Sequence, residues 1–144
     1  MRLAACVLFL ALLVATPVGA ESPTLVGVWL HPNKRIQVEI VPCGDRLCGQ
    51  IVWFKWPNDS VGAPLTDQQN PDPALQTRPL LGLNILQNLR YSGGSTWEDG
   101  NIYNPDDGSN YRAQMTMQAD GTVLMRAYLL FPILGEDLLW TRVE

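Results

Sequence analysis

The sequence predicts an all-β chain that folds as a single antiparallel up-and-down barrel of about eight strands with one long irregular loop. Three observations predict this fold. Apolar and polar residues alternate with a period of two in several segments, tight-turn sequences join most neighbouring segments, and two cysteines bracket one of these turns. Short connections make neighbouring strands antiparallel, and an eight-strand meander most readily hides its edges by closing.

Residues 1–20 have the three parts of a secretory signal. Arg2 is the charged start, residues 3–14 form an apolar run, and a small-residue cleavage site ends at Ala20. We expect cleavage after Ala20, which leaves residues 21–144 as one β-barrel domain in the periplasm or outside the cell. The apolar run is too short for a good membrane span, so none is expected in the mature chain.

The charge of the mature chain is acidic. Removing Arg2 from the 10 lysines and arginines leaves 9 basic residues against 14 acidic ones. A chain of this charge without a basic cluster is a poor nucleic-acid binder and a poor ligand for anionic membrane surfaces. Nucleic acid is therefore not expected as a partner, and no cofactor is predicted.

The first strand is expected at about residues 25–30, which are apolar on both faces. The next two strands, at about 35–43 and 47–55, form a hairpin whose turn lies between Cys43 and Cys48. Two cysteines in an oxidising compartment favour a disulfide. The spacing of these cysteines relative to the distant His31 is poor for a metal site, and none is predicted.

The register of this hairpin follows from the cysteines. If Cys43 faces Cys48, then Ile40 faces Ile51 and Val38 faces Trp53. Both apolar pairs then share one face. We expect this face to be the inner wall of the barrel.

Residues 57–79 form the long irregular loop, since prolines recur there among polar residues and no amphipathic period survives. Asp67, Asn70 and Arg78 favour an ordered loop, because Asx side chains bond neighbouring backbone and Arg78 could pair with a carboxylate. The alternative is a solvated, turn-rich lid whose charges are incidental.

The remaining strands are expected at about residues 80–86, 97–103, 110–118, 122–130 and 137–143. The glycine-rich segment that precedes Trp97 is expected to be a flexible loop.

Two registers remain open for the hairpin around residues 119–121. A three-residue loop pairs Met115 with Met125 and Ala113 with Ala127, and we favour it because every pair is apolar. A two-residue loop instead points Arg126 and Tyr128 into the barrel.

Gly27, Trp29 and Arg142 resemble the lipocalin pattern, in which a Trp of the first strand closes the barrel floor beneath a basic residue. An arginine stacked on a tryptophan face gains cation-π attraction. The resemblance implies a lipocalin-like or calycin-like barrel.

A second resemblance covers nearly the whole mature chain. The chain is similar to the bacterial secreted family catalogued as domain of unknown function 2147, which implies a small secreted barrel and no established catalytic residues. The motifs that carry this resemblance are Cys43 with Leu47-Cys48-Gly49-Gln50-Ile51, Asn70-Pro71-Asp72-Pro73, Arg78-Pro79-Leu80 with Gly82, Gly100-Asn101-Ile102-Tyr103-Asn104-Pro105 to Gly108 with Tyr111, and Trp140-Thr141-Arg142.

Three classes of function are compatible with these features. The favoured one is a non-catalytic binder of a small apolar or amphipathic molecule at a barrel mouth covered by the long loop. Arg126 and Tyr128 are similar to the Arg-x-Tyr pair with which intracellular fatty-acid-binding barrels hold a carboxylate. The candidate ligand-binding residues are Arg126, Tyr128, Asp67, Asn70, Arg78, Trp97 and Tyr103.

The alternatives are an interaction or structural module and an enzyme. The module would have a filled barrel and a partner surface made of Trp97, Tyr103 and Arg78. The enzyme would use the carboxylate of Asp67 or Asp106, because a single histidine and the absence of a free mature cysteine argue against nucleophilic and metal-assisted chemistry.

Overall fold

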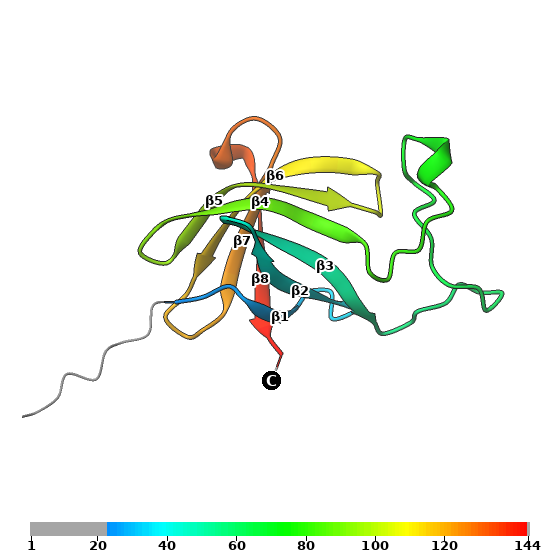
Figure 1. Cartoon of the computed structure of the whole chain (residues 1–144), viewed down its shortest axis with the longest axis horizontal. Helices are drawn as coiled ribbons and strands as arrows, with labels where there is room; N and C mark the ends of the chain where they lie inside the picture. Colours follow the sequence, from blue (N-terminus) through cyan, green and yellow to red (C-terminus); the bar gives the residue numbers. More distant parts are fainter. Residues whose placement is uncertain (1–22, 144) are drawn as a thin grey trace, which may run out of the picture.

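The computed structural model describes residues 23–143, so the predicted signal peptide lies outside the described residues. Strands pair antiparallel in chain order, and the last strand pairs with the first to close a barrel (Figure 1). The predicted all-β up-and-down barrel is confirmed. Its elements are β1 (Gly27–Leu30), β2 (Ile36–Cys43), β3 (Arg46–Phe54), the short 3-10 helix η1 (Pro73–Leu75), β4 (Asn84–Gly93), β5 (Thr96–Asn104), β6 (Ser109–Met117), β7 (Val123–Tyr128), the 3-10 helix η2 (Pro132–Leu134) and β8 (Glu136–Arg142).

The hydrophobic core lies inside the barrel. Alternate residues of each strand point inward, as Ala113 and Met115 do in β6, because side chains in a strand alternate between its two faces. The most deeply buried apolar side chains are Leu25, Trp29, Val38, Ile40, Ile51, Leu86, Leu89, Met115, Val123, Met125 and Trp140.

The predicted register of the β2–β3 hairpin is wrong. Cys48 lies opposite Val41, and Cys43 lies opposite Arg46. A two-residue turn of Gly44 and Asp45 replaces the four-residue loop that direct pairing of the cysteines requires. The predicted disulfide is nevertheless confirmed, since the two Cα atoms lie only 5.8 Å apart across the hairpin.

The prediction also places Trp53 on the wrong face of the hairpin. A register shift between Gln37 and Val38 pairs Trp53 with Gln37, and the Trp53 side chain is 39% exposed. Ile51 remains buried and pairs with Val38. The irregularity therefore turns Trp53 outward and brings Phe54 to the bowl, since one extra residue reverses the faces of the residues that follow it.

The fourth strand begins later and extends further than predicted. It runs through the segment expected to be a flexible loop, and the residues from Leu80 to Leu83 belong to the loop before it. Asn88 has a positive φ of 62°, and this interrupts the alternation that would identify the strand. The glycine-rich segment forms the β4–β5 turn.

The favoured register of the β6–β7 hairpin is confirmed. Met115 pairs with Met125 and Ala113 pairs with Ala127. The two-residue alternative, which points Arg126 inward, is wrong. All-apolar pairing decides the register, because the alternative would bury the charged Arg126 side chain in the inner face.

The seam between β1 and β8 is braced by Arg142. Only two residue pairs join these strands, Trp29 with Arg142 and Leu30 with Thr141. The Arg142 guanidinium lies 4.3 Å from the centre of the Trp29 ring and donates to the backbone carbonyls of Val26 and Thr24 at 3.0 and 2.8 Å. A Cβ on Gly27 would lie 2.5 Å from Arg142 Nη1, so only glycine leaves space for the guanidinium.

Removing the disulfide should lower stability without changing the fold. We expect Cys43→Ser/Cys48→Ser to lose about 2 kcal/mol of unfolding free energy under oxidising conditions, because the bond restricts the unfolded chain. Thermal and urea unfolding measure this loss. A reductant should lower the stability of the wild type to that of the variant, and equal melting temperatures for the two oxidised proteins would contradict the prediction.

Removing the seam arginine should be costly. We expect Arg142→Gln to lose about 1–3 kcal/mol, because it removes a stacked cation and two charged donors. Urea unfolding measures the loss, and Arg112→Gln in β6 is the matched control. Equal losses in the two variants would show that the seam does not depend on Arg142.

Candidate functional site

The barrel has two unlike ends. In an up-and-down barrel the loops that follow odd-numbered strands gather at one end, which we call the mouth, and the other loops gather at the opposite end, the closed end. The mouth therefore carries residues 31–35, 55–83, 105–108 and 129–135. The segment between β3 and β4 extends from the barrel on the right of Figure 1, and the loop with η2 lies at the top.

A cavity of about 1270 Å³ opens at the mouth, and we call it the bowl. All four mouth loops contribute to its wall. Its apolar lining residues are Ile36, Ile51, Phe54, Trp56, Leu65, Leu80, Ile85, Ile102, Tyr103, Tyr111, Met125, Ala127, Tyr128, Leu129, Leu130, Leu134, Leu138 and Trp140. The volume exceeds that of most small-molecule pockets, which reach about 1,000 Å³.

The floor of the bowl is packed. Ile51, Met125 and Trp140 border the bowl but are almost completely shielded from solvent. Within residues 23–143, no acceptor takes a hydrogen bond from the Trp140 indole N–H, so this apolar floor holds one unsatisfied donor. The barrel interior is therefore filled below the mouth, and the space for a ligand lies at the mouth.

His31 lies at the edge of this floor. Its ring meets Trp140 edge to face at 5.6 Å between ring centres, and its Nδ1 accepts a hydrogen bond from the backbone N–H of Asn33. Burial lowers the pKa of His31, and this effect outweighs the opposing influence of Asn33 and Asp106. At neutral pH the ring is uncharged and adds no cation to the bowl.

The charges around the bowl are mainly negative. Arg35 is the one lysine or arginine in its lining, whereas Asp59, Asp106, Asp107 and Glu136 are carboxylates. Asp107 accepts a hydrogen bond from Tyr111 at 2.7 Å, which lowers the pKa of Asp107 and keeps it ionised. The bowl therefore favours uncharged or cationic groups over anionic ones.

Four residues named by the sequence analysis form one network beside the mouth, in which Asp67, Asn70 and Tyr103 are buried and Arg78 is partly exposed. Asp67 is 0% exposed and accepts hydrogen bonds from Tyr103 Oη at 2.6 Å, Asn70 Nδ2 at 2.8 Å and Arg78 Nε at 2.8 Å. Arg78 also forms an ion pair with Asp67 at 2.7 Å. Burial would raise the pKa of Asp67, but these hydrogen bonds and the Arg78 charge together hold that pKa below its usual range.

This network, which we call the latch, attaches the long loop to the barrel. Tyr103 comes from β5, whereas Asp67, Asn70 and Arg78 come from the loop. A second contact lies nearby, where any Cβ on Gly108 would collide with the backbone carbonyl of Gln69. The long loop is thus an ordered wall of the bowl, and Asp67 uses its carboxylate oxygens for structure.

Arg126 lies outside the barrel. Its guanidinium forms a two-pronged ion pair with Asp137 of β8, with both nitrogen–oxygen distances 2.6 Å, and its Nη1 donates to the carbonyl of Pro132 at 3.1 Å. Tyr128 lines the bowl near its edge. Arg126 is thus paired with Asp137 and does not line the bowl, so the Arg-x-Tyr pair that the sequence grouped as a carboxylate anchor is not formed there.

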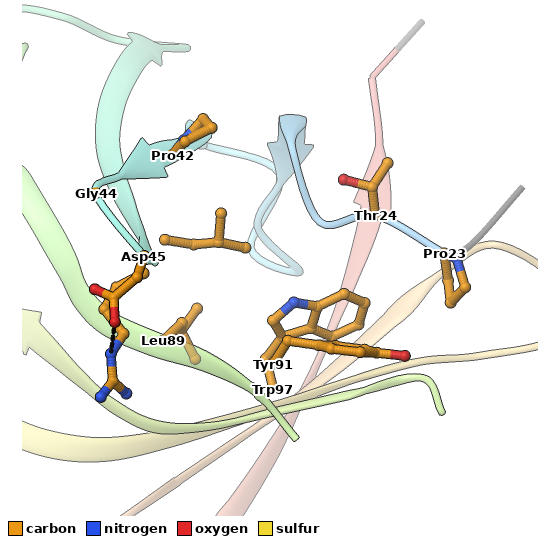
Figure 2. A pocket seen from close by; sticks show the side chains of 10 residues that line it. Pro23, Thr24, Pro42, Gly44, Asp45, Leu89, Tyr91 and Trp97 are labelled. Atoms are coloured by element: carbon orange, nitrogen blue, oxygen red, sulfur yellow. Dashed lines mark ion pairs between the residues drawn. The ribbon is translucent and has the colours of Figure 1, made fainter. Parts of the chain in front are cut away.

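Trp97 lies at the closed end. It is buried there beside Tyr91, with 5.3 Å between the ring centres, and lines a separate cavity of about 320 Å³ (Figure 2). Pro23 and Pro42 form other walls of this cavity. Trp97 is thus at the opposite end of the barrel from Tyr103 and Arg78, and these three residues do not share a surface.

Several mouth residues were missed by the sequence analysis. The side chains of Leu129, Leu130 and Leu134 line the bowl and are 66–78% exposed. Residues 129–130 were assigned to a strand because they continue an apolar run. Phe131 and Pro132 follow these two leucines directly. Because proline is rarely found inside a paired strand, Pro132 was the signal in the sequence that the leucines belong to a loop.

Removing the carboxylate of Asp67 should lower the free energy of unfolding and make that free energy less sensitive to acid. A carboxyl with a lowered folded-state pKa stabilises the protein above its unfolded pKa, and this stabilisation is lost as pH falls through the folded-state pKa. We expect Asp67→Asn to lose about 1–3 kcal/mol at neutral pH, because it leaves buried donors without a charged acceptor. We also expect the variant to lose less stability than the wild type below about pH 4.

Urea unfolding at neutral and acidic pH measures both effects. Asp45→Asn, which changes an exposed aspartate of the β2–β3 turn, is the control. An Asp67→Asn variant with wild-type acid dependence would contradict the role of the latch.

Comparisons with known proteins agree with the barrel. The solved structure of protein HP1028 from the human pathogen Helicobacter pylori, which is described as belonging to the lipocalin family, matches with a TM-score of 0.72 and 21% identity over 84% of each chain. At this identity the likeness establishes the fold alone. No curated protein gives a significant match. The family model described as "Uncharacterized protein conserved in bacteria (DUF2147)" matches residues 27–142, and this chain belongs to that family.

Proposed function

We propose that this protein is a non-catalytic carrier of a small, uncharged apolar molecule outside the cytoplasm. The observation that carries the proposal is the bowl of about 1270 Å³ at the barrel mouth, with walls from four loops and an apolar, packed floor. A concave, mainly apolar surface with a few polar groups is typical of small-molecule sites. The lipocalin-like fold agrees with this use of a barrel mouth.

The charges of the bowl indicate an uncharged ligand. The carboxylate anchor expected from Arg126 is absent, because that side chain is outside the barrel and paired with Asp137. Four carboxylates and one arginine line the bowl, so a ligand carboxylate would meet net repulsion. An ester, ketone or alcohol with an apolar body fits these walls better than a fatty acid.

The latch and the disulfide support the remaining parts of the proposal. Asp67 is buried and fully hydrogen-bonded, which leaves it unsuited to proton transfer with a substrate in the bowl. The disulfide between Cys43 and Cys48 favours an oxidising compartment. Among the described residues, no helix is long and apolar enough to cross a membrane.

Binding can be tested with the neutral fluorescent probe N-phenyl-1-naphthylamine. We expect the mature protein to bind the probe and methyl laurate to displace it, with laurate weaker by about tenfold because of repulsion by the bowl carboxylates. Failure of the probe to bind to the mature protein would overturn the carrier proposal. Equal displacement by the ester and the acid would overturn only the preference for an uncharged ligand.

Two variants locate the binding in the bowl. Ala127→Phe places a ring in the cavity and should weaken probe binding by at least about tenfold, since the ring occupies ligand space. Arg112→Phe, which adds the same ring on the exposed face of β6 away from the bowl, is the matched control and should bind the probe like the wild type. Circular dichroism and melting temperature establish that both variants are folded.

A further inference from the structure

The floor of the bowl contains an indole N–H group without an acceptor. Trp140 of β8 is 0% exposed and borders the bowl, and within residues 23–143 nothing accepts a hydrogen bond from its Nε1. An unpaired buried donor costs free energy, and most buried polar groups in folded proteins are therefore paired. The unpaired donor at this place requires a physical explanation.

The barrel satisfies its other fully buried indole internally. Trp29 is also 0% exposed, and its Nε1 donates to the backbone carbonyl of Leu25 at 2.8 Å. Trp29 does not line the bowl, whereas Trp140 does. Of these two tryptophans, the one with the unpaired N–H is thus the one that borders the ligand space.

His31, the aromatic neighbour of Trp140, does not supply the missing acceptor. Its Nδ1 already accepts a hydrogen bond from the backbone N–H of Asn33. Burial lowers the pKa of His31, so the ring is neutral and its single proton lies on the other nitrogen, Nε2. His31 Nε2 is therefore a donor, and an acceptor for Trp140 has to come from a bound molecule.

The other floor side chains favour a ligand oxygen over a buried water as that acceptor. Ile51 has no polar atom, and the sulfur of Met125 is only a weak acceptor. A buried water needs about two to four polar partners, whereas a carbonyl oxygen can accept one hydrogen bond while the rest of its molecule makes apolar contacts. The unbranched side chain of Met125 can shift to admit such an oxygen.

We propose that Trp140 Nε1 donates a hydrogen bond to a carbonyl oxygen of the ligand, so that the bowl takes an uncharged ketone or ester with its carbonyl group at the floor. This inference rests on the carrier function proposed above and narrows its ligand class. An indole donor has no charge and suits a neutral acceptor, because the carboxylates of the lining repel an anionic one. Trp140 is thus a residue that determines specificity.

The first test observes the donor in the wild-type mature protein by NMR. We expect methyl nonyl ketone to move the indole N–H proton of Trp140 downfield, because an acceptor oxygen deshields the donated proton. The alkene in which a methylidene group replaces the carbonyl oxygen has the same shape without an acceptor, so it should cause no such downfield shift. The signal is assigned through Val123, which pairs with Trp140 across the β7–β8 ladder.

The second test measures displacement of N-phenyl-1-naphthylamine by the same two ligands. We expect Trp140→Phe to lower the ratio of ketone affinity to alkene affinity by about threefold to tenfold, since one hydrogen bond to the ligand is lost. Changes in packing at this residue affect both ligands, so the ratio reports the hydrogen bond. Trp53→Phe, the same substitution at a partly exposed residue outside the bowl, is the matched control and should keep the wild-type ratio.

The outcomes separate this inference from the carrier proposal. Displacement of the probe by both ligands, with the same indole shift for ketone and alkene or with an unchanged ratio in Trp140→Phe, would overturn the role of Trp140 and leave the carrier proposal standing. Absence of binding by the probe and both ligands would overturn both proposals. The NMR comparison uses the wild type alone, so it decides the role of Trp140 even where Trp140→Phe does not fold.

Discussion

Closure of the barrel across the β1–β8 seam is the constraint on which the rest of this structure depends. This seam has only two residue pairs, fewer than any other pair of neighbouring strands in the described barrel. Arg142 compensates by stacking on Trp29 and binding two backbone carbonyls of the preceding segment. Because the ring is closed, no unpaired strand edge remains, and the loops after odd-numbered strands meet at one mouth.

The two ends of the barrel have different physical roles. The closed end contains the disulfide, the seam arginine and the aromatic pair of Tyr91 and Trp97, and it contributes to stability. The mouth contains the bowl, the long loop and the exposed apolar side chains of the β7–β8 loop. The latch links stability to the candidate site. The buried carboxylate of Asp67 holds the proline-rich loop against β5, where the loop forms a wall of the bowl. A loop of this composition would otherwise be costly to order.

The candidate site was predictable in part from the sequence. Asp67 and Arg78 were identified as candidates for ordering the loop, because an arginine near Asx residues suggests a charge-assisted pair. The role of Arg126 was not predictable from its neighbours, because its direction changes with the register of one hairpin. Trp97 and Tyr103 lie on the same strand, yet the strand carries them to opposite ends of the barrel.

The sequence was enough to predict eight strands, their antiparallel order and the disulfide partners, because alternation, turn residues and cysteine spacing are local signals, but it did not give the bounds of β4. It also determined the β6–β7 register, where only one pairing keeps the inner face apolar. The β2–β3 register and the outward turn of Trp53 became clear only in the folded chain, because a two-residue turn shifts the pairing by two residues and a single irregular residue then reverses the faces beyond it. The bowl and the latch also arise only in the folded chain, because each joins segments that are distant in the sequence.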